Sequence, residues 1–471
     1  MSTSPRRPGS HRGVPQLLIA SVALAHSVLF IVYQRPDWLT EWRDQTGYLL
    51  LGRAIAETGR FTRFPAAAAY VPEPIRTPAY PAFVALVDVV FGEHHLAIAG
   101  VQAVLFAITC LLVFAIARHV VSDRVALAAG LVTALYPPFP YYGALVLTET
   151  LTTTLVTAAV AVWLRALGTH GAGAFVASGV LFAAAALTRP SFQFLPLFMI
   201  AAALAASLAG ARGQAARPWR GALVMLGAFM VAVAPWIAYN AVYFHALTFS
   251  PAGGPGRQLF DGFWQAELPG RVEAQLTSIA TDTPDRLLRE ARARQVAAQS
   301  RLPPELVVSY VQQFADIRHI WLTPTEPNER VQARIVADHE YLRVGFQDIQ
   351  QDFGRFAWGR LTRGAFVLWA AEIPVRYSDI NRLPPLVIRL IWLPQVCLVA
   401  LAVVGVVVMA RAGALADAFG LAALLLYVTA FHLPISTEAR YSLPAKPAAL
   451  LLAVVAVAGL ARKLPPSQLQ A

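Results

Sequence analysis

HLAIAGVQAVLFAITCLLVFAIARH, His95–His119, contains a single Asp, Glu, Lys or Arg residue, Arg118, near its end. A membrane-spanning helix needs about 20 consecutive apolar residues, so this stretch is long enough to cross a bilayer. Similar runs recur along the chain of 471 residues, which is 57% apolar and only 14% charged. They do not alternate apolar and polar residues, as the strands of a membrane barrel would. We therefore predict an all-α, polytopic membrane protein with about ten transmembrane helices.

Basic residues between the apolar runs predict the side of the membrane on which each loop lies, because short cytoplasmic loops are enriched in Lys and Arg. The first run, Val14–Tyr33, is too long for a removed signal peptide, so we place the N-terminus in the cytoplasm. Alternation then assigns to the cytoplasmic side Arg124, Arg165, Arg212, Arg217, Arg220, Arg411, Arg462 and Lys463. Much of the net charge of +11 lies in these loops, and we expect no nucleic-acid partner.

Composition divides the chain into three parts. Residues 1–249 form an N-terminal transmembrane module, in which residues 34–94 make a first outer loop with interfacial helices. Residues 250–363 are rich in charge, Gln and Pro, and their amphipathic patterns predict a small, mostly helical, water-facing domain. Residues 364–471 hold the C-terminal transmembrane helices. The predicted topology places the first outer loop and the water-facing domain on the same, outer face.

The candidate chemistry begins in the first outer loop with Asp44. Helical spacing places Asp44, Tyr48 and Leu51 on one side of a helix. Trp38 and Trp42 share a helical face, as interfacial aromatic residues do. A carboxylate at a half-dry membrane face can act as a general base, and we assign Tyr48 to substrate binding beside it. The simpler interpretation is a solvated interfacial helix that carries an ordinary surface aspartate.

A second acid, Glu149, stands at the start of a predicted helix on the same side. An acid in the first turn complements the helix dipole, and this structural role is as well supported as a catalytic one. Asp44 and Glu149 could instead share a substrate or a divalent cation, since such cations prefer oxygen ligands. The cofactor is left open, with a divalent cation held by these two acids as the candidate.

Four cationic residues lie on this face next to apolar runs: Arg76, Arg189, Arg440 and Lys446. Any one of them could snorkel at a helix end. Together they predict a phosphate clamp, because the guanidinium fork of Arg fits two phosphate oxygens. No phosphate-cradling glycine loop, zinc-ligand spacing or serine nucleophile elbow stands out. An enzyme on the outer face has no nucleotide sugars at hand, so we expect a donor carried by a lipid.

Six motifs follow one another in the order RDQTGYLLLGRAIAETGRF (43–61), IRTPAYPAF (75–83), YPPFPYYGALVLTETL (136–151), ALTRPSF (186–192), APWIAYNAVYFHALTFSPAGG (234–254) and EARYSLPAKP (438–447). This ordered set resembles membrane glycosyltransferases of the GT-C fold, in particular family 39, the protein mannosyltransferase type, and its aminoarabinose-transferase relatives. The resemblance implies transfer of a hexose or pentose from a polyprenyl-phosphate donor, with inversion, on the periplasmic or extracytoplasmic side of the inner (plasma) membrane. The implied partners are the lipid-linked donor, membrane lipids, and a glycan, lipid or protein acceptor.

The resemblance also implies roles for particular residues. The acid of the family's first outer loop corresponds to Asp44, the helix-start acid to Glu149, and the arginine before the RY..P..P pattern to Arg440. The chain departs from the family pattern at two positions. Gln45 stands where an acidic pair often continues, and Tyr239 stands where an arginine is often found.

Two other functions are compatible with a polytopic chain. A transporter or flippase for a lipid-linked glycan would place polar groups in the middle of the membrane, often in paired repeats with broken helices. The sequence has no convincing internal repeat, and its acids cluster outside the apolar runs. A non-enzymatic scaffold gives no reason for acids and cations gathered on one face. These observations favour the glycosyltransferase.

Overall fold

The computed structural model describes residues 13–35, 44–210, 218–380 and 382–462. The predicted all-α class is confirmed: 81% of the structure is helical, and no strand occurs among the described residues. Outside the described ranges lie Trp38, Trp42, Arg212, Arg217 and Lys463. The predictions made for these five residues stay predictions.

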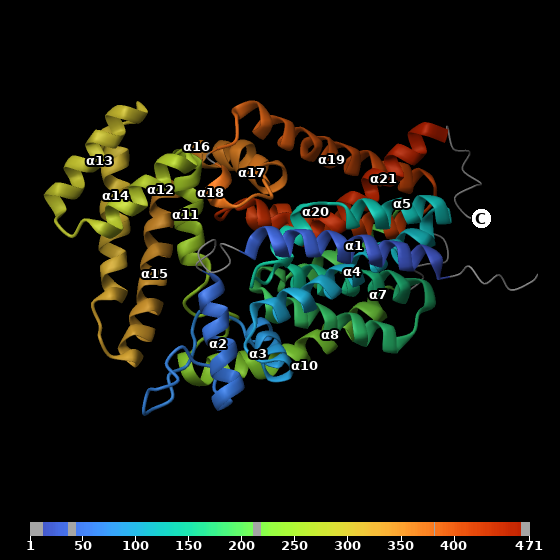
Figure 1. Ribbon diagram of the computed structural model, residues 1–471, viewed down its shortest axis with the longest axis horizontal. Helices are drawn as coiled ribbons and strands as arrows, with labels where there is room; N and C mark the ends of the chain where they lie inside the picture. Colours follow the sequence, from blue (N-terminus) through green and yellow to red (C-terminus); the bar gives the residue numbers. More distant parts are fainter. Residues whose placement is uncertain (1–12, 36–43, 211–217, 381, 463–471) are drawn as a thin grey trace, which may run out of the picture.

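Among the described residues, ten helices form the membrane bundle (Figure 1). They are α1 (Val14–Gln34), α4 (His95–Val120), α5 (Asp123–Ala134), α7 (Glu149–Thr169), α8 (Ala172–Thr188), α9 (Leu195–Leu208), α10 (Pro218–Phe244), α19 (Pro385–Arg411), α20 (Leu415–His432) and α21 (Lys446–Arg462). Eight helical segments of the described chain are long and apolar enough to cross a membrane. The other two members of the bundle are shorter, with 12 residues in α5 and 17 in α8. The chain is therefore a multi-span membrane protein.

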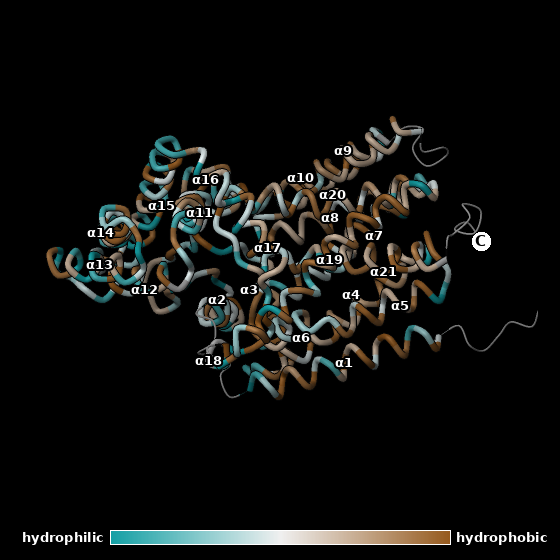
Figure 2. Tube along the Cα trace, turned by 90° about the horizontal axis from the view of Figure 1, so that it is seen from above, coloured by the Kyte–Doolittle hydropathy of each residue, from teal (hydrophilic) through white to brown (hydrophobic). Residues whose placement is uncertain are grey.

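The spans differ in how deeply they lie in the bundle. In the last span, Ala439–Ala461, 72% of an apolar stretch of 18 residues is buried inside the protein. In α1 the corresponding buried fraction is 17%. On α1, Leu17 and Leu29 expose 69% and 67% of their surface. A soluble protein rarely gathers so many exposed large apolar side chains, so these faces fit contact with lipid. Figure 2 shows hydrophobic residues along the bundle helices and more hydrophilic ones over α13 (Arg286–Ser300) and neighbouring helices.

Close packing of α8 on α10 depends on a glycine. A Cβ atom added to Gly179 would lie 2.2 Å from the carbonyl oxygen of Met225 and 2.9 Å from the Cβ of Ala228. Overpacking of this kind typically costs about 1–3 kcal/mol, so Gly179→Ala should lower the melting temperature of the purified protein by several degrees. Gly227→Ala on α10 is the matched control, because no atom lies within 4 Å of its added Cβ. Equal melting temperatures for the two variants would contradict this account of the packing.

The first outer loop folds against the end of the bundle. Its helices are α2 (Asp44–Thr58) and α3 (Ala79–Phe91), which pack on each other, with Gly52 of α2 directly against Val84 of α3. Prolines in the sequence YPPFPYY end α5 and open the short helix α6 (Pro138–Gly143), since proline cannot donate the hydrogen bond that an interior helical residue needs. These prolines therefore separate α5 from the helices that follow it.

The polar middle segment forms six helices with a hydrophobic core of their own. They are α11 (Pro255–Glu267), α12 (Gly270–Asp282), α13, α14 (Pro304–Leu322), α15 (Pro327–Gln351) and α16 (Phe353–Gly359). Trp264, Tyr310 and Phe314 lie at the centre of that core. We call this unit the outer domain. In Figure 1 it lies at one end of the bundle, while α1 begins and α21 ends at the opposite end.

The outer domain holds the loop that leads into the last span. The amide of Ser436 donates to the carbonyl of Gln258 on α11 over 2.8 Å, and the amide of Thr437 donates to the side chain of Gln265 over 2.8 Å. Buried Arg360 donates to the carbonyl oxygens of Leu433, at 2.7 Å, and Ile435. These bonds fix the backbone just ahead of the turn η4 (Ala439–Ala445), which carries Arg440.

Candidate active site

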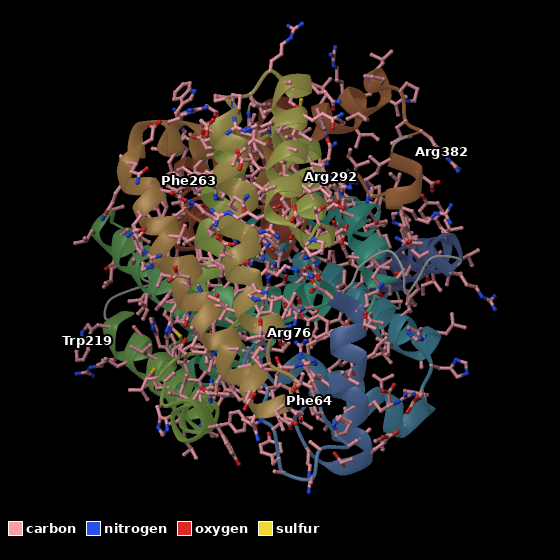
Figure 3. All side chains as sticks on the ribbon, turned by 90° about the vertical axis from the view of Figure 1, so that its left-hand side faces the viewer. Phe64, Arg76, Trp219, Phe263, Arg292 and Arg382 are labelled. Carbon is pink, nitrogen blue, oxygen red and sulfur yellow. The ribbon has the colours of Figure 1, made fainter. Side chains whose placement is uncertain are left out.

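Asp44, Tyr48 and Arg76 meet at the start of α2. Arg76 Nη2 donates to Asp44 Oδ1 over 2.5 Å, and Arg76 Nη1 donates to the hydroxyl of Tyr48 over 2.8 Å. The guanidinium also lies over the Tyr48 ring, 4.5 Å from its centroid. Asp44 and Tyr48 can share one arginine because residues four apart lie on one helical face. In Figure 3, Arg76 lies beside α2.

Glu149, Arg189 and Arg440 join the same group from three different helix ends. Glu149 is the first residue of α7 and is buried. Its Oε1 atom lies 3.2 Å from Arg189 Nη1 and 3.6 Å from Arg440 Nη1. Arg440 Nη2 in turn donates to Asp44 Oδ2 over 3.2 Å. The two acids that the sequence singled out therefore share one arginine.

We call this group the carboxylate–arginine cluster: Asp44, Arg76, Glu149, Arg189, Arg440 and Glu438. Glu438 was not among the predicted site residues. Its carboxylate accepts from Arg440 Nε over 2.6 Å and from the hydroxyl of Tyr441 over 3.0 Å. The motif EARYSLPAKP could have indicated Glu438, because an acid stands there two residues before the arginine. In the structure the backbone of Glu438 is extended.

The charges around Asp44 determine the ionisation state of its carboxyl group. Burial alone would raise the pKa of this carboxyl, but the guanidinium groups of Arg76 and Arg440 hold that pKa well below its usual value. The side chain of Asp44 is still 34% exposed, whereas those of Glu149 and Arg440 are 2% and 9% exposed. Asp44 is thus an ionised carboxylate that a ligand can reach.

Lys446 lies outside this cluster. Its ammonium is buried and donates to the backbone carbonyl of Trp369 over 2.6 Å. Glu372 lies nearby and interacts electrostatically with Lys446, and Glu372 Oε1 accepts from the hydroxyl of Tyr142 over 3.1 Å. A role of Lys446 in phosphate binding stays a prediction, without a contact to the cluster in the described part of the chain.

Burial raises the pKa of Glu372 to about 7, against the opposing effects of Tyr142 and Lys446. Since its ordinary value is 4.5, the stability that this group contributes is complete below pH 4.5 and is lost as the pH rises towards 7. We expect the free energy of unfolding in detergent to fall by on the order of 2–3 kcal/mol across this window. Glu372→Gln should flatten the dependence of melting temperature on pH. If the melting temperature of Glu372→Gln depends on pH as steeply as that of the wild type, another group is responsible for the pH dependence.

The carboxylate oxygens of the cluster that could bind a metal ion are paired with arginines. No group of three His, Cys, Asp or Glu side chains suited to a metal ion occurs among the residues that the structure describes. Asp44 and Glu149 each face two guanidinium groups, and positive neighbours oppose the binding of a further cation. These positive neighbours disfavour a cation at Asp44 and Glu149, so we derive no step through one, and the divalent cation stays a prediction.

All members of the cluster lie at one end of the bundle. Glu149 is the first residue of one span, Arg189 precedes the first residue of the next, and Arg440 is the second residue of the last span. The outer domain contacts the segment just before Arg440 at the same end. The structure therefore brings together six of the seven predicted site residues: Asp44, Tyr48, Arg76, Glu149, Arg189 and Arg440. Their roles in catalysis and binding stay predictions.

The chain was compared with protein families, with curated proteins and with solved structures. Residues 74–239 match the family described as dolichyl-phosphate-mannose-protein mannosyltransferase. No curated protein matches the chain. The matched part includes Arg76, Glu149 and Arg189 of the cluster but not Asp44 or Arg440.

Among solved structures, one match is the archaeal oligosaccharyltransferase AglB from Archaeoglobus fulgidus, in complex with an inhibitory peptide and a dolichol-phosphate. It has 12% sequence identity and a TM-score of 0.53 over 97% of this chain. This chain spans about half, 51%, of the length of AglB. Another match, ArnT from Cupriavidus metallidurans bound to undecaprenyl phosphate, has 15% identity and a TM-score of 0.42, with 98% of this chain and 82% of ArnT covered. The similarity to AglB confirms the predicted GT-C fold.

Proposed function

We propose that this chain, a multi-span membrane protein with the GT-C fold, transfers a sugar from a polyprenyl-phosphate carrier to an acceptor. The observation that carries the proposal is the carboxylate–arginine cluster, in which Asp44 is held between Arg76 and Arg440 at one end of the bundle. The matched mannosyltransferase family, whose description names a dolichyl-phosphate donor, supports a donor of this type. The transferred sugar is a hexose or pentose.

Arg76 and Arg440 would hold the phosphate of the donor. Both guanidinium groups now pair with Asp44, at 2.5 Å and 3.2 Å, so they already point to one place. A phosphate gains from two such forks because each can donate two parallel hydrogen bonds. As the bond between the anomeric carbon and the phosphate oxygen breaks, negative charge grows on the leaving phosphate. Fixed positive groups stabilise that charge without reorganising.

Asp44 would act on the acceptor. An acceptor hydroxyl or amine must lose its proton as its oxygen or nitrogen bonds to the anomeric carbon. The ionised carboxylate of Asp44 can take that proton, and attack from the face opposite the phosphate inverts the configuration. Glu149 and Glu438 hold Arg440 in place from the other sides, at 3.6 Å and 2.6 Å. Their negative charge offsets the buried positive charge of the arginine before the donor binds.

A transporter or flippase of a lipid-linked glycan is the competing function. Such a protein would need charged groups near the middle of the bilayer. The cluster instead gathers residues from the ends of three spans, and the side chain of Asp44 is 34% exposed although Glu149 is buried. These positions favour transfer at the membrane surface over passage through the bundle.

The proposal is tested with the purified full-length chain and a panel of polyprenyl-phosphate sugars, both pentoses and hexoses. We expect at least one donor to lose its sugar to water or to an added acceptor, with polyprenyl phosphate as the second product. If no donor loses its sugar, and the protein instead moves a lipid-linked glycan across the membrane of reconstituted vesicles, the transporter function would replace the proposed transferase function.

We also propose that the site faces the periplasmic or extracytoplasmic side of the inner membrane. The positive-inside bias of the loops supports this orientation. Gln295 is exposed on α13 of the outer domain, so Gln295→Cys in intact spheroplasts should react with a membrane-impermeant thiol reagent. Labelling only after lysis would reverse the orientation and place the cluster in the cytoplasm.

A further inference from the structure

A cavity of about 170 Å³ lies between the first outer loop and the outer domain, apart from the contact between Asp44 and Arg440. One wall is the loop segment that contains Arg63, Phe64 and residues 72–75. The other wall comes from the end of α14 and the start of α15, with Trp321, Arg330 and Arg334. We call this cavity the arginine pocket. Figure 3, which looks onto the outer domain, shows Phe64 and Arg76 between α2 and α15.

The two walls are held together by apolar packing beside the pocket. Val71 of the loop and Val331 of α15 are buried in one small cluster with Phe244 at the end of α10. Phe64 of the pocket wall and Ile335, one turn further along α15, pack against the same cluster. The pocket is therefore built on a fixed joint between the loop, the bundle and the outer domain.

The pocket carries more positive than negative charge. Its lining holds Arg63, Arg330 and Arg334 but a single acid, Glu73, which leaves an excess of two positive charges. Arg63 Nε pairs with Glu73 Oε2 over 2.5 Å. Arg330 is exposed, and its Nε donates to the neutral carbonyl of Pro324 over 2.8 Å.

Arg334 shows the imbalance most clearly. Its guanidinium lies 4.0 Å from the centroid of the Trp321 ring, and no ion pair to Arg334 occurs among the described residues. Burial lowers the pKa of Arg334, and repulsion from Arg63 lowers it further, although Glu73 acts in the opposite direction. An anion in the pocket would relieve this repulsion. The Trp321 ring would hold the guanidinium in place for it, since arginine stacks well on aromatic faces.

Glu73 connects the pocket to the carboxylate–arginine cluster. Its Oε1 atom accepts hydrogen bonds from the amides of Ile75 and Arg76 over 2.9 Å and 3.0 Å. The Arg76 side chain leaves this wall on the other side and pairs with Asp44. The pocket and the cluster are thus two separate sites that share one short loop segment.

We propose that the arginine pocket binds a phosphate monoester, as a second anion site distinct from the one for the donor phosphate. A phosphate monoester carries about −1.5 to −2 charges at pH 7, which matches the excess of two positive charges. Arg330 and Arg334 supply guanidinium donors that phosphate oxygens accept, whereas Glu73 holds the guanidinium fork of Arg63. The Trp321 and Phe64 rings give an apolar wall for the group esterified to the phosphate. The ester is either a soluble molecule or a phosphomonoester lipid headgroup.

The test uses the purified full-length chain, phenyl phosphate as the soluble probe and tryptophan fluorescence as the readout. Phenyl phosphate should change the emission of the wild type and of Arg286→Gln, a control at an exposed arginine of the outer domain. The change should disappear in Trp321→Phe, because Trp321 reports from inside the pocket. Arg334→Gln should weaken binding at least about tenfold, the loss expected for one charge-assisted hydrogen bond. If Arg334→Gln does not fold, Arg330→Gln at an exposed position replaces it.

Nanodiscs separate the two sources of the phosphate. A change in Trp321 emission with phosphatidate discs, but not with phosphatidylcholine discs, would identify a lipid headgroup, and a response to phenyl phosphate alone would identify a soluble ester. Wild-type affinity in both arginine variants, or an undiminished change in Trp321→Phe, would overturn the proposal. Sugar transfer is measured separately, so that outcome would leave the proposed transferase standing.

Discussion

Asp44→Asn should reduce sugar transfer by at least about a hundredfold, because a positioned general base contributes roughly 10²–10⁴-fold to such a step. The asparagine keeps the shape of the side chain but can no longer accept the acceptor's proton. Donor affinity should stay the same or increase, since Arg76 and Arg440 lose the carboxylate that competes with the donor phosphate. The measurement pairs kcat for transfer with a direct binding titration of the lipid-linked donor.

Asp123→Asn provides the control for this substitution. Asp123 pairs with Arg118 at the opposite end of α4, and its side chain is 77% exposed. Loss of an exposed pair typically costs less than about 1 kcal/mol, so this variant should keep normal transfer. Near-wild-type transfer by Asp44→Asn would instead make Asp44 an ordinary surface residue, which would remove the catalytic assignment.

The pH dependence of transfer gives a second readout of Asp44. Because Arg76 and Arg440 lower its pKa, the carboxylate is ionised at every pH above its usual value of 3.8. We therefore expect no acidic decline of transfer that is attributable to Asp44 above about pH 4. A decline centred near pH 6 that disappears in Asp44→Asn would contradict the electrostatic account.

Arg440→Lys should weaken donor binding by about tenfold to a hundredfold, although the charge is kept. The guanidinium of Arg440 reaches Glu438, Asp44 and Glu149 at once, at 2.6, 3.2 and 3.6 Å. A lysine ammonium is a point charge and cannot reproduce this fork, and each lost charge-assisted bond costs about 1.5–3 kcal/mol. The dissociation constant of the donor, measured by titration, should rise accordingly.

Arg165→Lys is the control for Arg440→Lys, because Arg165 is exposed near the end of α7 that lies away from the cluster. Both variants should be compared by thermal melting, since buried Glu149 and partly exposed Glu438 both pair with Arg440. A folded Arg440→Lys protein with normal donor affinity would limit Arg440 to the structural role of anchoring a helix end.

Much of the architecture follows from local sequence. Long apolar runs predict helices that span a membrane wherever they occur, because helices satisfy their own backbone hydrogen bonds. The YPPFPYY break is equally local, since proline cannot donate within a helix. The residues that we propose for phosphate binding and proton transfer, Arg440 and Asp44, are also recognisable from the motifs that carry them.

The tertiary structure alone decided which of these residues meet. Asp44 and Arg440 are 396 positions apart, and no periodicity predicts that one guanidinium bridges Asp44 and Glu149. Glu438 and Lys446 flank η4, but only Glu438 pairs with Arg440, whereas Lys446 donates to the carbonyl of Trp369. The arginine pocket likewise arises only where the first outer loop packs on α15. Sequence determines local conformation and charge, whereas packing over long separations decides which charges share a site.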